Sequence, residues 1–200
     1  MEKRRFMREN KGYTLIEMII VIAIVAVLTG AAMVTISIIH SAKAKEASST
    51  LEDALGEAQM NAKDKMCVAV DPADPSAGKK QQPDYRFALC VYKSGSKYYV
   101  KKGYYFGNGA DITAEGSYDF PADENVGSGK GTSFSAYVKV TYVDDAGTER
   151  EIADSTPVYI IYDRQGMCTA GYGKFKFYKS NKNVLISTVS LNKNGSYSSN

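Results

Sequence analysis

The sequence predicts an α+β protein, in which one long N-terminal helix packs on a domain of antiparallel β-sheet. Residues 18–39 carry no charge, and the stretch after them places apolar residues at steps of three and four, without a proline, up to about residue 65. This spacing is the period of a helix. Fourteen of the fifteen tyrosines and thirteen of the seventeen glycines lie after Asp84, where alternating apolar residues and short turns are typical of strands.

Three parts are expected in the 200 residues: a leader (residues 1–12), a long helix (13–65) whose membrane-spanning part covers about residues 18–39, and a β-rich globular domain (66–200). As a helix, the uncharged stretch would be roughly 33 Å long, which is enough to cross a bilayer. Five basic and two acidic residues among the first twelve account for the whole formal net charge of +3. Because basic residues stay on the cytoplasmic side, we expect a single-pass protein of the cytoplasmic membrane with its N-terminus in the cytoplasm.

A carboxylate stands at the start of the apolar stretch, in the segment "KGYTLIEMIIVIAIVAVL". Three interpretations of the N-terminus are open: a secretory signal cleaved near residues 29–33, an uncleaved anchor, and a leader cut before the apolar stretch. An acid inside a membrane helix costs about 2.5 to 3.5 kcal/mol near the bilayer centre and therefore indicates a function. The alternative is that Glu17 lies at headgroup level near a helix N-terminus, where the macrodipole favours an acid.

The segment "KGYTLIE", with basic residues before it and the apolar stretch after it, resembles the class III leader of type IV pilins and pseudopilins. The resemblance covers residues 1 to about 65 and implies the pilin fold. It implies that a prepilin peptidase cleaves after Gly12 and methylates the new amino terminus at Tyr13. It also implies an assembly role for Glu17, whose carboxylate would neutralise the Tyr13 amine of a neighbouring subunit, since such a pair costs less in apolar surroundings than either lone charge.

The same resemblance implies a structural subunit of a type IV pilus or of a type II secretion-like pseudopilus. Its partners would be the prepilin peptidase, other pilin subunits in a homo- or hetero-filament, the membrane and an inner-membrane assembly platform, and its final place an extracellular filament at the cell surface. The segments "VYIIYDRQGMCTAGYGKFKFY" and "VLISTVSLNKNGSY" resemble the C-terminal pattern of GspH/FimT-like minor pseudopilins. This favours a minor over a main subunit, whereas the choice between pilus, protein secretion and natural competence stays open.

Beyond the membrane stretch, the helix is expected to carry one narrow apolar face. That face consists of Ala44, Ala47, Leu51, Ala54, Leu55, Ala58, Ala62 and Met66. Three hairpins are then expected: residues 85–106 with Gly95 in the turn, residues 134–143 with "TEREIA", and "KFKFYK" with "NVLISTVSL". In the third hairpin the lysines and phenylalanines should point to opposite sides. The segment "PVYIIYD" is apolar on both faces and is predicted as a central strand.

Residues 107–133 contain six glycines and show no clear periodicity, which predicts a long exposed loop. The acids of this loop fit no spacing of a calcium-binding loop. The polar tail from Asn192 is expected to fray.

The three cysteines, Cys67, Cys90 and Cys168, are an odd number for an exported domain. One disulfide is conceivable, with three pairings available. The pair Cys67 and Cys90 is favoured, because it would staple the end of the helix to the first strand. The alternative is that all three are reduced and buried as small apolar residues. Their spacing does not indicate zinc.

A binding module displayed on a filament is the alternative function. After residue 163 the chain has basic residues interleaved with aromatic ones and has no acid. The candidate DNA contacts are Arg164, Lys174, Lys176, Lys179 and Lys182. Such residues would hold phosphates and stack bases, as in DNA capture for natural transformation. The plainer interpretation is that the lysines face solvent opposite a phenylalanine core.

An enzyme is not expected from this sequence. His40 is the only histidine and stands where the apolar stretch ends, which is typical of a membrane-interface residue. The sequence contains no nucleophile elbow, phosphate loop or metal motif. We therefore predict no catalytic residue, no metal and no cofactor.

Overall fold

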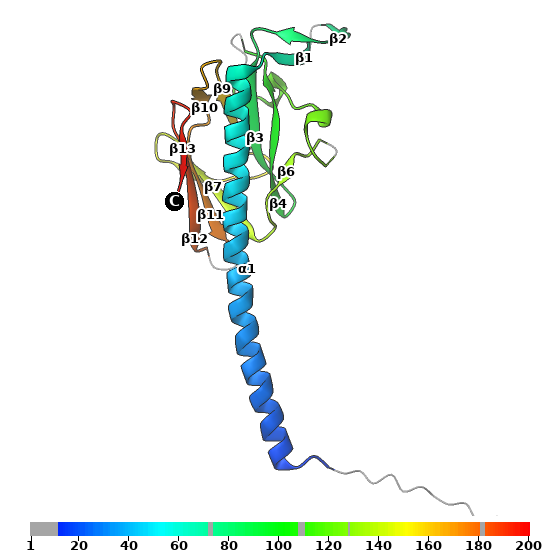
Figure 1. The fold of residues 1–200 in the computed structure, drawn as a ribbon, viewed down its shortest axis with the longest axis vertical. Coiled ribbons are helices and arrows are strands. Elements are labelled where there is room, and N and C mark those ends of the chain that lie inside the picture. The colour runs from blue at the N-terminus through cyan, green and yellow to red at the C-terminus, as the bar shows by residue number, and fades with distance from the viewer. Residues whose placement is uncertain (1–11, 72–73, 108–110, 128, 181–182) are drawn as a thin grey trace, which may run out of the picture. The chain divides into compact units, whose positions relative to one another are not determined.

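The computed structural model describes residues 12–71, 74–107, 111–127, 129–180 and 183–200. Its long helix is α1 (Leu15–Asp64), and most of the chain after α1 forms antiparallel strands (Figure 1). The predicted fold class is confirmed, since one long N-terminal helix precedes antiparallel sheets in a pilin-like α+β arrangement.

The described residues form two compact units, one up to residue 39 and one from residue 40 onward, and α1 begins in the first and ends in the second. In the first unit the helical residues 15–36 are all exposed, although most of them are apolar. The uncharged stretch thus forms a helix with apolar side chains on every side, which is the pattern of a helix surrounded by lipid.

In the second unit, α1 buries a single stripe of small and aliphatic residues. The buried residues are Ala44, Ala47, Ser48, Leu51, Ala54, Leu55, Ala58 and Ala62. The predicted apolar face is therefore confirmed except for Met66, which lies beyond the end of α1 and is 43% exposed. Residues spaced by three and four lie on one side of a helix, and the alanines allow its backbone to approach the sheets closely.

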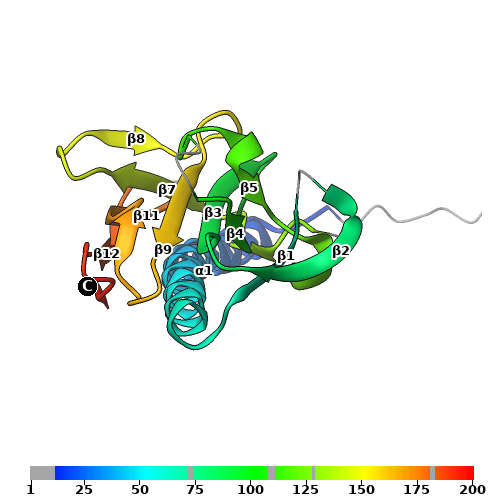
Figure 2. The ribbon, with the colours of Figure 1, turned by 90° about the horizontal axis from the view of Figure 1, so that it is seen from above.

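Two larger sheets and one small hairpin come after the helix. The first larger sheet has the order β10 (Cys168–Ala170), β9 (Val158–Tyr162), β3 (Arg86–Ser94), β4 (Lys97–Tyr105), β5 (Tyr118–Asp119), and β6 (Thr132–Ser133) also pairs with β4. The second has the order β13 (Tyr197–Ser199), β12 (Leu185–Leu191), β11 (Gly173–Lys179), β7 (Val138–Val143), β8 (Glu149–Glu151). The hairpin is β1 (Cys67–Asp71) with β2 (Asp74–Gln82). Figure 2 shows α1 end on, beside β9 and β3.

One hydrophobic core joins α1 to both larger sheets. Leu51 and Leu55 of α1 lie in it with Leu89 of β3 and with Phe175 and Phe177 of β11, all fully buried. Burying an aliphatic or aromatic side chain of this size contributes roughly 1.5 to 3 kcal/mol. The core thus holds the second half of α1 against the sheets.

The three predicted hairpins are confirmed. β3 pairs with β4 around Gly95, whose φ of 61° suits a glycine, β7 pairs with β8 and β11 pairs with β12. β9 lies between β3 and β10, and all its side chains are buried or half-buried, as predicted for a central strand. On β11, Phe175 and Phe177 face the core, whereas Lys174 is exposed.

The prediction of a long exposed loop over residues 107–133 is confirmed in part, because most of its described residues are exposed but the segment is not irregular throughout. This segment contains the 3-10 helices η1 (Glu115–Ser117) and η2 (Ala122–Glu124) as well as β5 and β6. The Asn125 side chain accounts for part of this order, because it accepts from the Lys102 amide and donates to the Lys102 carbonyl, both at 2.8 Å. The Asn125 side chain thus pairs with the backbone of β4 at Lys102 in place of a neighbouring strand.

Two further elements were not expected from the sequence. The hairpin of β1 and β2 lies in a stretch that shows no alternating pattern. The C-terminal tail, expected to fray, forms β13 and pairs with β12. Both elements depend on pairing partners that the local sequence does not specify.

Candidate functional site

The N-terminus of α1 is closed by a capping box. The backbone amide and the hydroxyl of Thr14 both donate to the same carboxylate oxygen of Glu17, Oε2, at 2.7 and 2.8 Å. The Glu17 amide points back toward the Thr14 hydroxyl oxygen at 3.3 Å. Thr14 and Glu17 are spaced as S/T-x-x-E, which satisfies two amides that the helix itself leaves unpaired. The signal for this cap is the spacing of Thr14 and Glu17 in the segment "TLIE".

The capping box decides where the Glu17 carboxylate points, but it does not occupy the whole group. Both bonds from Thr14 end on Oε2, and among the described residues no hydrogen bond to Oε1 is found. Glu17 therefore belongs to the helix N-terminus, and one of its carboxylate oxygens is left for a further donor. The assembly role of Glu17 stays a prediction.

Gly12 and Tyr13 precede this cap and belong to no helix or strand. The Tyr13 side chain is 83% exposed, and the position of a Cβ on Gly12 has no neighbour within 4 Å. Nothing in the described residues therefore crowds the peptide bond between them. The predicted cleavage residues precede α1, and Glu17 lies in its first turn, so that all three stand within six positions of one another.

The helix beyond the cap is long and apolar enough to cross a membrane, judged by its length and composition. Its polar side chains are satisfied locally, because the hydroxyls of Thr29 and Thr35 donate to the carbonyls of Val25 and Ala31 at 2.7 and 3.1 Å. Such bonds within the helix matter in a bilayer, where water is not available to polar groups.

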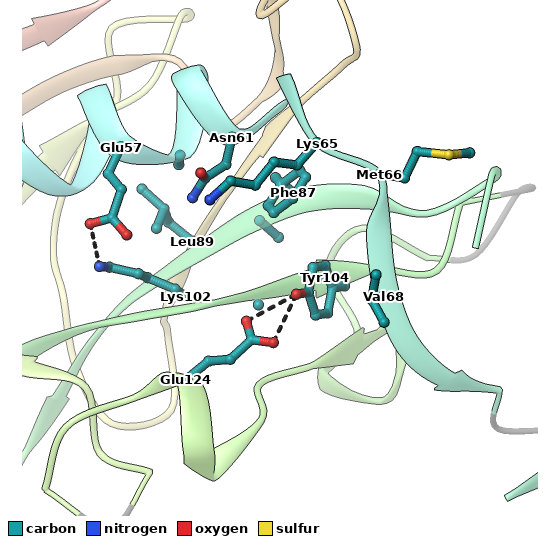
Figure 3. Close-up of a pocket in the computed structure, with 13 residues that line it drawn as sticks. Glu57, Asn61, Lys65, Met66, Val68, Phe87, Leu89, Lys102, Tyr104 and Glu124 are labelled. Atoms are coloured by element: carbon teal, nitrogen blue, oxygen red, sulfur yellow. Dashed lines mark hydrogen bonds and ion pairs between the residues drawn. The ribbon is translucent and has the colours of Figure 1, made fainter. Parts of the chain in front are cut away.

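A second candidate site is a hollow of about 380 Å³ between the end of α1, β1, β3 and β4 (Figure 3). Lys102 forms an ion pair with Glu57 of α1, and the Tyr104 hydroxyl donates to both oxygens of Glu124 at 2.8 and 3.0 Å. Burial raises the pKa of Tyr104, so that its hydroxyl keeps the proton it donates. Both carboxylates in the hollow are therefore already engaged, and the ion pair of Glu57 joins α1 to β4.

The cysteines do not form the predicted bridge, since Cys67, Cys90 and Cys168 are all free and buried. Cys67 packs with Tyr104 and Phe87, whose side chain lies on the α1 side of β3. Cys90 is three residues further along the same strand and points to the opposite face, because side chains alternate along a strand. Burial raises the pKa of each thiol to about 12, so that all three stay protonated and unreactive near neutral pH.

The candidate DNA contacts do not form a uniformly basic surface. Lys176 is paired with Glu149 at 2.6 Å, and Lys193 is paired with Asp145 at 3.2 Å. Glu149 comes from β8 and Asp145 from the turn before it, so both precede the acid-free stretch after residue 163. Arg164 donates to the Pro83 carbonyl.

The remaining candidates add little to a DNA surface. Lys174 is exposed and Lys179 half-buried on β11, whereas Lys182 lies outside the described residues. Phe175 and Phe177 are fully buried and therefore not available to stack bases. DNA contact stays a prediction, and fewer residues support it than the sequence suggested.

His40 is not part of a catalytic arrangement in the described residues. The His40 ring centroid lies 4.8 Å from that of Tyr137. Its Nδ1 atom is buried and has no hydrogen-bond partner among the described residues. Among the described residues, no three His, Cys, Asp or Glu side chains are grouped so as to hold a metal.

Residues 7–33 match the prokaryotic N-terminal methylation motif. The match covers the candidate cleavage residues, Glu17 and most of the apolar stretch. It is consistent with type IV pilins and pseudopilins, and a prepilin leader implies processing by a prepilin peptidase, anchoring in a membrane and assembly with other pilins. This class of protein is structural rather than enzymatic. No curated protein and no solved structure matches the chain.

Proposed function

We propose that the chain is a structural subunit of a type IV pilus or a type II secretion-like pseudopilus, cleaved after Gly12 and methylated on Tyr13. The methylation motif over residues 7–33 carries this proposal. The long helix supports it, because one end is apolar on all sides and the other is packed on sheets. After export the domain lies outside the cytoplasmic membrane, and the subunit leaves the membrane for an extracellular filament through its assembly platform.

We infer that Glu17 serves assembly through its second carboxylate oxygen. Cleavage after Gly12 would leave a positively charged amine on Tyr13, next to the cap. Thr14 holds Oε2 of Glu17, which leaves Oε1 to accept from the amine of a neighbouring subunit. The pairing lets two opposite charges neutralise each other in apolar surroundings, which costs less than burying either charge alone.

A minor rather than a main subunit is the finer form of the proposal. The described C-terminal elements support it, because the turn at residues 163–166 is closed by the Gly166 amide donating to the Asp163 carbonyl at 2.9 Å. The extended hairpin of β11 and β12 comes next. These elements correspond to the segments that resemble GspH/FimT-like pseudopilins.

The first experiment is the mass of the N-terminal peptide of the native protein extracted from membranes. A chain that begins at Tyr13 with one added methyl group supports the proposal. A chain that begins at Met1, or one cleaved within residues 29–33, contradicts it.

The assembly role of Glu17 is tested with Glu17→Gln and Glu17→Ala. We expect normal cleavage after Gly12 and a large loss of incorporation into filaments, measured by the pilin content of sheared filaments. Glu52→Gln, at a half-buried acid of α1 in the globular unit, is the matched control and should assemble normally. Normal incorporation of both Glu17 variants would rule out the pairing.

A further inference from the structure

The sheet containing β3, β4 and β9 has a second face, turned away from the core that α1 shares. Leu89 of β3 belongs to that core, and its neighbours Ala88 and Cys90 therefore project to the other side. Cys90 is directly opposite Tyr159 on β9 and Lys101 on β4. Small residues thus lie at the middle of this outer face, between aromatic and charged ones.

Aromatic rings cover the outer face in stacked pairs. Tyr118 lies on Tyr159 with 4.2 Å between ring centroids and 11° between planes, and Tyr92 stacks on Tyr99 at 5.5 Å. The Lys101 ammonium lies over the Tyr92 ring, 4.5 Å from its centroid. Aromatic pairs in this arrangement contribute beyond their buried area, so the platform is preorganised.

A glycine allows residues 118–120 to lie on this face. A Cβ at Gly103 would be 2.1 Å from the Asp119 carbonyl oxygen and 2.6 Å from the Phe120 ring. The Tyr118 hydroxyl donates to the Ile112 carbonyl at 2.6 Å, which fixes the segment that precedes η1. The chain after β4 therefore forms one wall beside the platform.

Two adjoining hollows lie along this wall, with volumes of about 240 and 340 Å³. They share Thr113, Ser155, Pro157 and Tyr159. The two hollows adjoin at these shared residues and are together called the groove, each hollow being one lobe, and the half-buried Tyr159 lines both lobes.

The polar side chains of the groove are balanced in charge. Lys101, Glu115 and Asp154 line the smaller lobe, and Arg150 lines the larger one. The Arg150 guanidinium is engaged with the carbonyls of Thr156 and Pro157 at 2.8 and 3.2 Å. Within the described part of the chain, the carboxylates of Glu115 and Asp154 make neither an ion pair nor a hydrogen bond.

We propose that this groove binds an uncharged oligosaccharide. The C–H face of a sugar ring packs on a tyrosine ring, and its hydroxyls both donate to carboxylates and accept from an ammonium. The groove offers these partners together: the Tyr159 ring as a platform, Glu115 and Asp154 as acceptors, and Lys101 as donor. Pockets for small ligands typically combine an apolar floor with a few placed polar groups.

The charges argue against two other occupants. A nucleic acid needs an excess of cations along its phosphates, whereas the two acids of the smaller lobe outnumber its one lysine. An apolar segment of a second copy of this chain would remove Glu115 and Asp154 from water without a partner, which is costly. A neutral polyhydroxylated ligand would hydrogen-bond both to the two acids and to the lysine of the smaller lobe.

The test uses the full chain, unassembled, in a detergent whose headgroup is not a sugar, because a sugar headgroup would compete. The probes are neutral hexasaccharides with glucose, xylose or N-acetylglucosamine units, titrated by calorimetry and by tyrosine fluorescence, since the protein has no tryptophan. We expect saturable binding to at least one probe with a Kd below about 1 mM.

Variants then assign the binding to the groove. Tyr159→Ala should weaken binding about tenfold or more, whereas Tyr137→Ala, at a tyrosine 52% exposed outside the groove, should not. Because Tyr159 supports Tyr118, its loss could disturb the fold, and the double variant Glu115→Gln, Asp154→Asn provides a milder test at exposed positions. It should weaken binding at least threefold, whereas Asp53→Asn on α1 leaves it unchanged.

Three outcomes would overturn the proposal. The first is the absence of saturable binding to every probe, and the second is an equal loss of sugar binding in Tyr137→Ala and Tyr159→Ala. The third is salt-dependent binding of single-stranded DNA, or self-association, that Tyr159→Ala abolishes and with which no sugar competes. The assay needs no filament, so its failure would leave the proposed pilin function untouched. Failure of cleavage after Gly12 would likewise leave a positive sugar result standing.

Discussion

The two halves of α1 are both rich in apolar residues, but they place them differently. Before residue 40, large aliphatic side chains surround the helix, and Ile22 and Leu28 are 63% and 64% exposed. After it, the apolar residues lie along one stripe, and Leu51 and Leu55 are 0% exposed. A helix that is apolar all round requires an apolar solvent, whereas a stripe requires only one apolar partner surface. Side-chain placement, more than apolar content, therefore decides whether a helix segment meets lipid or a sheet.

The largest expected difference between the halves is in core packing. Leu51→Ala removes a fully buried side chain and should lower the free energy of unfolding of the globular unit by about 2 to 5 kcal/mol. Val25→Ala, at a side chain 55% exposed, should leave that unfolding unchanged. Denaturant titration of the full chain in micelles, followed by tyrosine fluorescence, measures both. Equal losses would mean that the first half also packs on the domain.

A smaller effect is expected at the N-terminus of the first half. Thr14→Ala removes the capping hydroxyl that bonds Glu17, and loss of such a cap costs about 0.5 to 2 kcal/mol of helix stability. Amide hydrogen exchange at residues 15–18 should therefore speed up in micelles. Thr29→Ala also loses a hydroxyl, but one that bonds the Val25 carbonyl within the helix, and should leave these amides unchanged. If exchange at the cap is unaltered in Thr14→Ala, the capping box is not formed in solution.

The smallest expected effect is on stability at low pH. It concerns the globular unit, which contains the second half of α1. Hydrogen bonds from Lys176 and then from Thr141 lower the pKa of Glu149 from its ordinary 4.5 to about 2. Because the folded pKa is the lower one, this stabilisation is complete above about pH 4.5 and is lost as the pH falls toward 2. Glu149 is largely exposed, and such pairs contribute no more than about 1 kcal/mol.

Glu149→Gln should accordingly lower the melting temperature slightly at pH 6 and flatten its decline between pH 4.5 and 2. Thermal unfolding across this range measures the effect, with Asp53→Asn as the control at an exposed acid without an ion pair in the described residues. An unchanged decline in Glu149→Gln would assign the acid sensitivity to other groups.

The elements whose patterns are local could be predicted from the sequence. The uncharged stretch of 22 residues, the stripe from Ala44 to Ala62, and the hairpin around Gly95 each have a period or a turn residue that admits one structure. The leader segment with Gly12 and Glu17 is local in the same sense, and so is the capping signal at Thr14. Each pattern works through neighbours within a few positions of the chain.

Only the tertiary structure decided the features that depend on distant partners. Asn125 orders the segment after β4 through the backbone of Lys102, β8 supplies the acid that pairs with Lys176, and opposite faces of one sheet keep Cys67 and Cys90 apart. The groove around Tyr159 likewise joins residues from β9, β3, β4 and the segment before η1. Strand pairing brings together residues that are far apart in the sequence. A local periodicity does not predict such contacts, because a sheet is stabilised mainly by contacts between its strands.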